Sequence, residues 1–340
     1  MTAAERAFVA RLTRRANTLA PELAARELRA FDLIRDSLTD AELAKAINAG
    51  QVDALIADLL SDKRLDPSLV QLRARLDRGL KEAAASEAKN LPSRLATVSF
   101  DTLSPHVLEA ARELDVRVSS AIKDDVRATV RQTVTDGIEA GKNPRTVATR
   151  IQQYVGLSPQ QARAVENFRT ELETGDRAAL DRVLGRGTIR TPNGDEINRA
   201  SHAGGQGLTA RQLGTLDAKL GAEALTPAQV ERLTESYRRR LLAWNAESNA
   251  RTMALDAQKI GQHASWEDAV ERGVIERGQL FRTWLAVGGP GGDGRNREEH
   301  LAMHGETVGF DDTFSNGEFT PGDSTYNCRC QARIFAKAVA

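Results

Sequence analysis

The feature that most constrains this sequence is an apolar residue at every fourth position over a stretch of more than two dozen residues. The positions are Leu114, Val118, Ile122, Val126, Val130, Val134 and Ile138. A helix turns by about 100° per residue, so a spacing of four rotates each apolar side chain by about 40° from the previous one. The apolar stripe therefore winds around the helix. We expect successive partners to cover it, from the same chain or from another subunit.

Capping signals set the ends of this helix and of its successors. Ser104 and Pro105 form an N-cap followed by a proline at the first helical position. The segment 141–144, Gly-Lys-Asn-Pro, ends the helix, and a second helix is expected from Pro144 to Tyr154. Ser158 with Gln161 forms a capping box that opens a further helix.

A similar Thr-Pro-Ala-Gln start at Thr226 predicts a long helix that ends at about Gln258. Its expected core-facing residues are Val230, Leu233, Tyr237, Leu241, Trp244 and Leu255. The compact basic run 238–240, Arg-Arg-Arg, fans over about 200° of a helix, so we interpret it as a solvated surface.

The chain divides into three parts by composition. Residues 1–90 are rich in Ala, Leu, Arg, Asp and Glu, and predict short helices separated by turns near Ser37–Asp40 and Ala49–Gly50. The segment Asn90–Leu103 breaks this pattern and is the first boundary. Residues 91–278 form a helical middle region, in which the segment 185–207 is expected to be a mobile or partner-ordered loop.

From residue 279 the helical periodicity fades. The runs Leu280–Trp284 and Cys328–Phe335 are typical of strands, so residues 279–340 predict a small α+β C-terminal domain. The predicted fold class is therefore mainly α with a small α+β C-terminal domain, in which long helices precede short strands after residue 279.

Charge and cysteine content restrict the function. The 340 residues hold 47 Lys and Arg against 47 Asp and Glu, which argues against a protein that wraps a nucleic acid backbone and leaves only local DNA contact. No apolar run is long enough for a membrane-spanning helix. The two cysteines, Cys328 and Cys330, are two positions apart and suit a reducing compartment, so we expect a soluble protein made in a cytoplasm.

The C-terminal region carries a specific order of residues. A Trp-containing strand is followed by an Asp, an Arg-x-x-His, a Gly, a Pro and a terminal Cys-Arg-Cys. The motif residues are Trp284, Asp293, Arg297, His300, Gly305, Pro321, Cys328 and Cys330. In this order the chain resembles the phage Mu F-like head morphogenesis family, the minor head proteins of tailed phages. Weaker similarity extends upstream through the segments 141–151, 155–162 and 250–252.

The resemblance implies a function. It implies a minor head protein of a tailed phage or prophage, assembled in the bacterial cytoplasm and located in the virion, at the portal vertex or capsid interior. Its partners would be the portal protein and other capsid proteins, with local contact to packaged DNA, and its role would lie in head morphogenesis, DNA packaging or ejection. The chain departs from the family at Met253, where a Glu is usual, and in the glycine-rich expansion 288–293.

The motif residues allow two physical interpretations. Asp293, Arg295 and Arg297 can form a buried polar network with His300 under Trp284. Alternatively, His300 can hold a structural zinc ion together with Cys328 and Cys330, and His304 lies one helical turn away. A regular strand would hold the two cysteines about 6.6 Å apart at the backbone, so Cys-x-Cys chelates readily only where the strand bends.

Enzyme motifs are incomplete. The segment from His300 to His304 lacks the Glu of a zincin, and it also lacks the His-x-Glu of a zinc deaminase. We therefore expect no enzymatic activity and assign no catalytic residue. The alternatives are a zinc- or thiol-dependent enzyme that uses His300, Cys328 and Cys330, and a free-standing DNA-binding protein.

Overall fold

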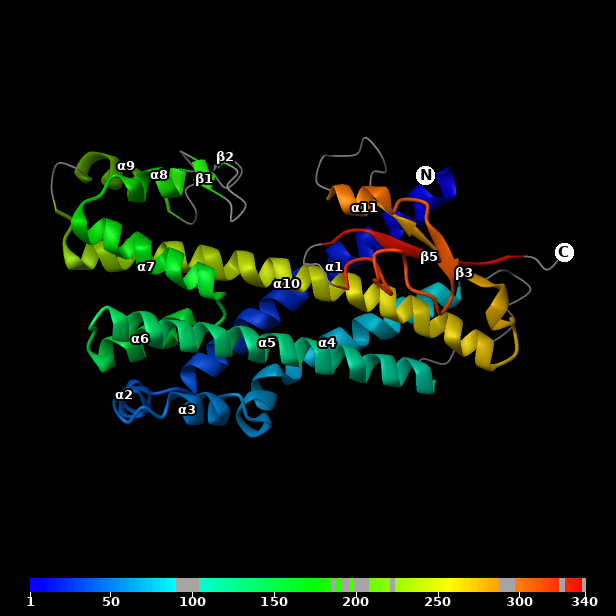
Figure 1. Cartoon of the computed structure of the whole chain (residues 1–340), viewed down its shortest axis with the longest axis horizontal. Coiled ribbons are helices and arrows are strands. Elements are labelled where there is room, and N and C mark those ends of the chain that lie inside the picture. Colours follow the sequence, from blue (N-terminus) through cyan, green and yellow to red (C-terminus); the bar gives the residue numbers. More distant parts are fainter. Residues whose placement is uncertain are drawn as a thin grey trace. The chain divides into compact units, whose positions relative to one another are not determined.

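The computed structural model describes residues 1–89, 104–184, 208–220, 224–287, 297–323 and 328–337, and the backbone of two short strands at 188–190 and 196–198. It confirms a mainly α-helical protein with a small antiparallel sheet near the C-terminus (Figure 1). The helices are α1 (Ala3–Asp36), α2 (Asp40–Asn48), α3 (Val52–Leu59), α4 (Asp62–Ala88), α5 (Pro105–Glu139), α6 (Pro144–Tyr154), α7 (Pro159–Thr174), α8 (Ala178–Leu184), α9 (Ala210–Lys219), α10 (Pro227–Glu271) and α11 (Glu298–Ala302).

The chain forms two compact units. The first consists of Met1–Ala30, Asp66–Ala121 and Ala246–Ala340, and the second of Phe31–Leu65 and Ile122–Asn245. These units do not follow the three consecutive parts expected from composition, because the long helices α1, α4, α5 and α10 each contribute residues to both. The first unit contains all three proposed metal ligands.

The N-terminal region differs from the short helices that were expected. Helix α1 has 34 residues and α4 has 27, while α2 and α3 are short and the predicted turns at 37–40 and 49–50 are confirmed. Helix α1 continues because its apolar stripe has no break. The stripe is buried throughout and includes Leu12, Leu19, Leu23, Phe31 and Ile34. Burial of this continuous stripe keeps the helix intact through the proline at position 21.

Helix α5 begins and ends where the capping signals predicted. The Ser104 hydroxyl accepts a hydrogen bond from the backbone N–H of Val107, and Gly141 has a φ of 62° just after the helix. Six of the seven residues of the winding stripe are buried within the chain itself, but Ile138 is 64% exposed. The chain therefore covers most of this stripe without a second subunit.

Helix α10 is longer than expected and ends at Glu271 instead of near Gln258. Trp244 is 45% exposed, and Leu242 is buried in place of the expected Leu241. One position along a helix is a rotation of about 100°, which is enough to exchange a core-facing residue for its neighbour. The arginine run was expected to be a solvated face, and Arg239 and Arg240 are exposed. Arg238 departs from that expectation, because it is buried, pairs with Glu235 at 2.6 Å and donates to the Gln153 carbonyl.

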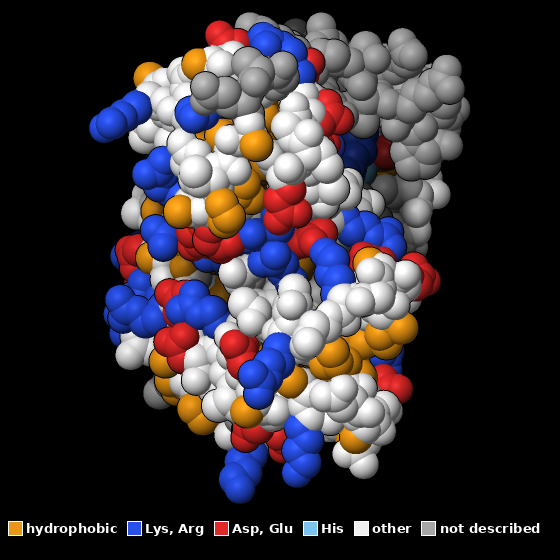
Figure 2. Space-filling view, turned by 90° about the vertical axis from the view of Figure 1, so that its left-hand side faces the viewer, with side chains coloured by type: hydrophobic (Ala, Val, Ile, Leu, Met, Phe, Trp, Pro, Cys, Tyr) orange, Lys and Arg blue, Asp and Glu red, His pale blue; other side chains and the backbone are white. Residues whose placement is uncertain are grey.

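The whole segment 185–207 was expected to be a mobile or partner-ordered loop. It contains a short antiparallel hairpin in which β1 (Thr188–Arg190) pairs with β2 (Glu196–Asn198). The rest of that segment, like the predicted boundary Asn90–Leu103, lies outside the described residues. On the face drawn in Figure 2, basic and acidic side chains are interspersed, in agreement with the balanced charge.

The C-terminal sheet has three antiparallel strands. Central β3 (Leu280–Leu285) lies between β4 (Thr307–Gly309) and β5 (Gln331–Ala336), with Trp284 opposite Ala332. The predicted first strand is confirmed, but the second begins three residues later than expected, so both cysteines precede it. Strand β3 ends at Leu285 opposite Gln331, which leaves residues 328–330 without a strand to pair with.

Within the described ranges, no helix combines the length and the apolar character that a membrane crossing requires.

Candidate metal centre

Three potential metal ligands from distant parts of the sequence converge in the first unit. His300 is on the short helix α11, and Cys328 and Cys330 lie just before β5. The His300 Nδ1 atom is 3.3 Å from the Cys328 Sγ atom and 3.9 Å from the Cys330 Sγ atom. The three ligand atoms all lie within 4.8 Å of one another. The cluster could therefore bind a metal ion.

The spacing between the nitrogen and each sulfur fits a tetrahedral ion with soft ligands. Zn–S distances of about 2.3 Å and Zn–N distances of about 2.0 Å place tetrahedral nitrogen and sulfur ligands ~3.6 Å apart, and two sulfurs ~3.8 Å apart. The two observed N···S distances, 3.3 and 3.9 Å, bracket that value. One imidazole and two thiols are donors that zinc prefers.

The position of the cysteines explains why a Cys-x-Cys sequence reaches this geometry. In a regular strand, two residues on the same face are held well apart by the extended backbone. Cys328 and Cys330 precede β5 and have no ladder that fixes them in that conformation. Both sulfurs lie near the same imidazole nitrogen.

Aromatic side chains enclose the centre. Trp284 is fully buried and meets the His300 ring edge-on, with 5.4 Å between ring centroids and an interplanar angle of 80°. Phe314 also meets Trp284 edge-on, with 5.1 Å between the ring centroids. His300 is 5% exposed and Cys330 is 1% exposed. The centre is thus largely buried, and Trp284, which was expected to cover a polar network around His300, contacts a proposed metal ligand.

The two thiols differ in acidity. A hydrogen bond from Cys330 and the positive charge of Lys259 lower the pKa of Cys328 to about 6, although burial opposes this shift. The pKa of Cys330 is raised well above its usual range, because its thiol donates to Cys328 and is itself buried. One thiolate is therefore available near neutral pH, and binding of a metal would displace the remaining proton.

A buried lysine supports the turn beside Cys328. Lys259 of α10 is 5% exposed, and its ammonium group donates to the carbonyl oxygen of Pro321. The next residue, Gly322, has a φ of 93°, and a Cβ atom there would lie 2.6 Å from the Cys328 Cβ. The Pro321–Gly322 turn therefore packs directly against a proposed ligand. The lysine had no signal in the sequence, since it is one of many charged residues on a long helix.

Of the three residues expected to form a polar network with His300, the structure describes only Arg297, which does not join it. Arg297 is exposed at the start of α11, where its side chain makes no capping hydrogen bond, so it is not part of a buried network. Asp293 and Arg295 lie outside the described residues. His304 is directed elsewhere, because its Nδ1 accepts a hydrogen bond from the Ala286 N–H at 3.2 Å. It does not belong to the ligand cluster.

Two further residues organise the surrounding fold. Gly305, a motif residue, has a φ of 90°, and its N–H donates to the Trp284 carbonyl at 2.9 Å, which joins α11 to β3. Arg282 of β3 was missed by sequence reasoning. It is 1% exposed, donates to the carbonyls of Asp312 and Phe319, and lies 3.9 Å over the Phe319 ring. The available signal was that Arg282 lies two positions from both Leu280 and Trp284, so it shares their buried face of the strand.

Comparisons with protein-family models, with curated proteins and with solved structures found no match to this chain.

Proposed function

We propose that this protein is a minor head protein of a tailed phage or prophage, which binds the portal or the capsid interior and acts in head morphogenesis. The observation that supports the proposal is the arrangement of the motif residues. Trp284, His300, Gly305, Pro321, Cys328 and Cys330 all lie in one small region of the first unit, linked by the ring contact, hydrogen bonds and turn described above. A motif whose members build one local structure is more informative than a motif of scattered residues.

The balanced charge also supports this function. With equal numbers of basic and acidic residues, the chain has no excess charge to hold it on packaged DNA. Protein contacts would retain it in the head instead, and any contact with DNA would be local.

Co-purification tests this proposal. The chain, expressed together with the other head proteins of its genome, should purify with the portal ring or with mature particles. Its absence from both would contradict the proposal.

We further propose that the centre holds a structural zinc ion through His300, Cys328 and Cys330. Zinc would join α11 to the segment that leads into β5, and the two ligands His300 and Cys328 are 28 positions apart in the sequence. Bound zinc supplies folding energy through such a connection. The proposal assigns the centre no catalytic role.

Metal analysis of the purified protein tests the zinc site. We expect about one zinc per chain in the wild type, and its loss in C328S, C330S and H300A, because each variant leaves only two protein ligands from this cluster. H106A is the matched control, since His106 lies on α5 and pairs with Glu271. Equal zinc in all variants would contradict the site.

A second candidate function is a zinc- or thiol-dependent enzyme that uses the same residues. One observation favours it: Cys328 combines a pKa lowered to about 6 with an imidazole nitrogen at 3.3 Å, which is a nucleophile beside a base. Turnover of p-nitrophenyl acetate that C328S abolishes, with an unchanged circular dichroism spectrum, would support the enzyme. Zinc loss that unfolds the C-terminal sheet would support the structural role.

A further inference from the structure

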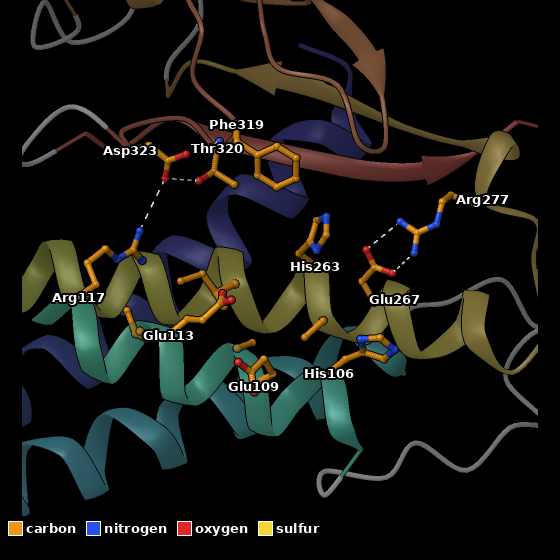
Figure 3. A pocket seen from close by; sticks show the side chains of 14 residues that line it. His106, Glu109, Glu113, Arg117, His263, Glu267, Arg277, Phe319, Thr320 and Asp323 are labelled. Atoms are coloured by element: carbon orange, nitrogen blue, oxygen red, sulfur yellow. Dashed lines mark hydrogen bonds and ion pairs between the residues drawn. The ribbon is translucent and has the colours of Figure 1, made fainter.

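A groove in the first unit lies outside the metal centre. One side is formed by α5, a second by α10, and a third by the loop that carries Phe319, Thr320 and Asp323 (Figure 3). Its volume is about 670 Å³. The α5 residues that line it run from His106 to Arg117 at intervals of three and four, so they share one face of the helix.

The floor of the groove is apolar. Ala110 and Leu114 of α5 lie opposite Ile260 and Ala264 of α10. The two alanines leave space where longer side chains would fill it. This floor can accept the methylene groups of a long side chain, whose charged end would then reach the rim.

The charges at the rim are unequal. Four carboxylates and two arginines line the groove. Arg277 forms an ion pair with Glu267, in which the distance from Arg277 Nη1 to Glu267 Oε1 is 3.0 Å. The distance from Arg117 Nη1 to Asp323 Oδ1 is 3.9 Å. Both arginines are thus matched with a carboxylate of the same groove, as the dashed lines in Figure 3 show.

Two carboxylates remain on α5. Glu109 makes one long contact, at 3.5 Å, with the exposed Arg112, and such a surface pair contributes little. Glu113 is exposed and has no hydrogen bond or ion pair with any residue that the structure describes. The two lie four positions apart, so like charges face each other across one helical turn, an arrangement that is unfavourable without a cation.

One buried polar atom in the groove wall is also unsatisfied. The Nε2 atom of His263 is inaccessible to solvent and has no hydrogen-bond partner in the described chain. The ring stacks on Phe310 at 4.3 Å, and burial lowers its pKa to about 4. A neutral imidazole offers no positive charge to Glu109 or Glu113.

We propose that this groove docks a segment of another protein chain that presents two Lys or Arg side chains one helical turn apart, opposite Glu109 and Glu113. The proposal rests on the proposed function, because a minor head protein has to bind other head proteins. Charge complementarity identifies the partner chemistry: the groove has one carboxylate without an ion pair among the described residues, a second with only a long surface contact, and an apolar floor for methylene groups. A protein segment presents cations at the required spacing of one turn.

A model peptide tests the groove directly. The probe is a short, fluorescein-labelled, alanine-rich helix with two lysines one turn apart, and fluorescence anisotropy measures its binding to the full-length protein. We expect binding that weakens with added salt, and no binding of the same peptide with glutamates in place of the lysines. The double variant E109Q/E113Q should weaken the lysine peptide roughly tenfold, as expected for the loss of two ion pairs.

The control removes the same amount of charge elsewhere. E139Q/E173Q changes two exposed glutamates outside the groove, at the end of α5 and on α7, and should leave affinity unchanged. The inference is overturned if the lysine peptide does not bind the wild type. The same result would follow if another part of this chain filled the groove. Equal weakening by both double variants also overturns the inference. Co-purification with particles, together with either result, would leave the minor head function intact and reject only the groove.

Discussion

At the residue scale, the left-handed glycines near the centre differ in what surrounds them. Gly322 and Gly317 both have positive φ angles, of 93° and 83°. A Cβ atom would meet Cys328 at 2.6 Å in the first case and has no atom within 4 Å in the second. The pair therefore separates backbone strain, which both positions share, from close packing against a ligand, which only Gly322 has.

We predict that G322A destabilises the protein more than G317A. Both variants incur the backbone strain of order 1–3 kcal/mol that a non-glycine residue has in this conformation. G322A also pushes the turn from Cys328, so it should release zinc to a chelator faster. Urea unfolding and zinc release to a colorimetric chelator measure the two effects. Equal zinc release from both variants would show that the turn does not position the cysteine.

The acidity of Cys328 gives a second prediction at this scale. In the metal-free protein, the far-ultraviolet absorbance of the thiolate should titrate with a midpoint of about 6 for Cys328. An ordinary cysteine titrates at about 8.5. Because the hydrogen bond from Cys330 is the largest cause of the low pKa, C330A should move the midpoint upward. A midpoint that does not move in C330A would exclude that cause.

The sign of the linked stability follows from the direction of the shift. A folded-state pKa below the unfolded value means that ionised Cys328 stabilises the metal-free fold above the pKa of the unfolded thiol. This contribution decreases as the pH falls, and it is lost below about pH 6. The raised pKa of Cys330 has the opposite effect at high pH. It decreases the stability of the metal-free fold once the pH exceeds the pKa of the unfolded thiol, because ionisation of Cys330 is unfavourable in the folded state.

At the scale of elements, helix packing depends on individual glycines. Gly261 of α10 lies where a Cβ atom would come within 2.5 Å of the Leu80 carbonyl oxygen and 3.0 Å of the Ala84 nitrogen, both in the backbone of α4. A backbone cannot move aside as a flexible side chain can. The close approach of α10 to α4 within the first unit therefore requires glycine at this position.

We predict opposite effects of two glycine-to-alanine substitutions in helices. G261A should destabilise the protein by about 1–3 kcal/mol, because overpacking outweighs the better helix propensity of alanine. G214A in α9, where nothing lies within 4 Å, should stabilise it by up to about 1 kcal/mol. Denaturant unfolding of both variants measures the difference. Stabilisation by G261A would contradict the close packing of the two helices.

At the scale of the whole molecule, the metal centre is confined to one of the two compact units. The second unit has its own buried residues, which include Val147, Ile151, Phe168, Leu172 and Tyr237. A metal ion is therefore expected to stabilise the C-terminal sheet without being needed for most of the helices.

We predict that removal of zinc by a chelator leaves most of the helical circular dichroism unchanged and abolishes the near-ultraviolet signal of Trp284. This tryptophan is fully buried against the His300 ring, so its environment reports on the centre. W244F removes an exposed tryptophan and serves as the control. Loss of the entire helical signal on chelation would show that the metal stabilises the whole chain, contrary to this division.

The sequence by itself determined the features that depend on neighbouring residues. The caps at Ser104 and Ser158 and the strand that contains Trp284 are all formed as predicted, because capping and alternation act over a few residues. The same applies to the mainly helical fold class.

Only the tertiary structure decided which side chains are buried and which distant residues meet. In α10 the buried residue is Leu242, one position after the expected Leu241. In the N-terminal region, packing of α1 gives one long helix where short helices were expected. His300 reaches the cysteines only because the register of β5 on β3 ends before Cys330, which frees residues 328–330 to turn towards α11. The sequence offered these three residues as one possible ligand set, but long-range packing decided that they meet.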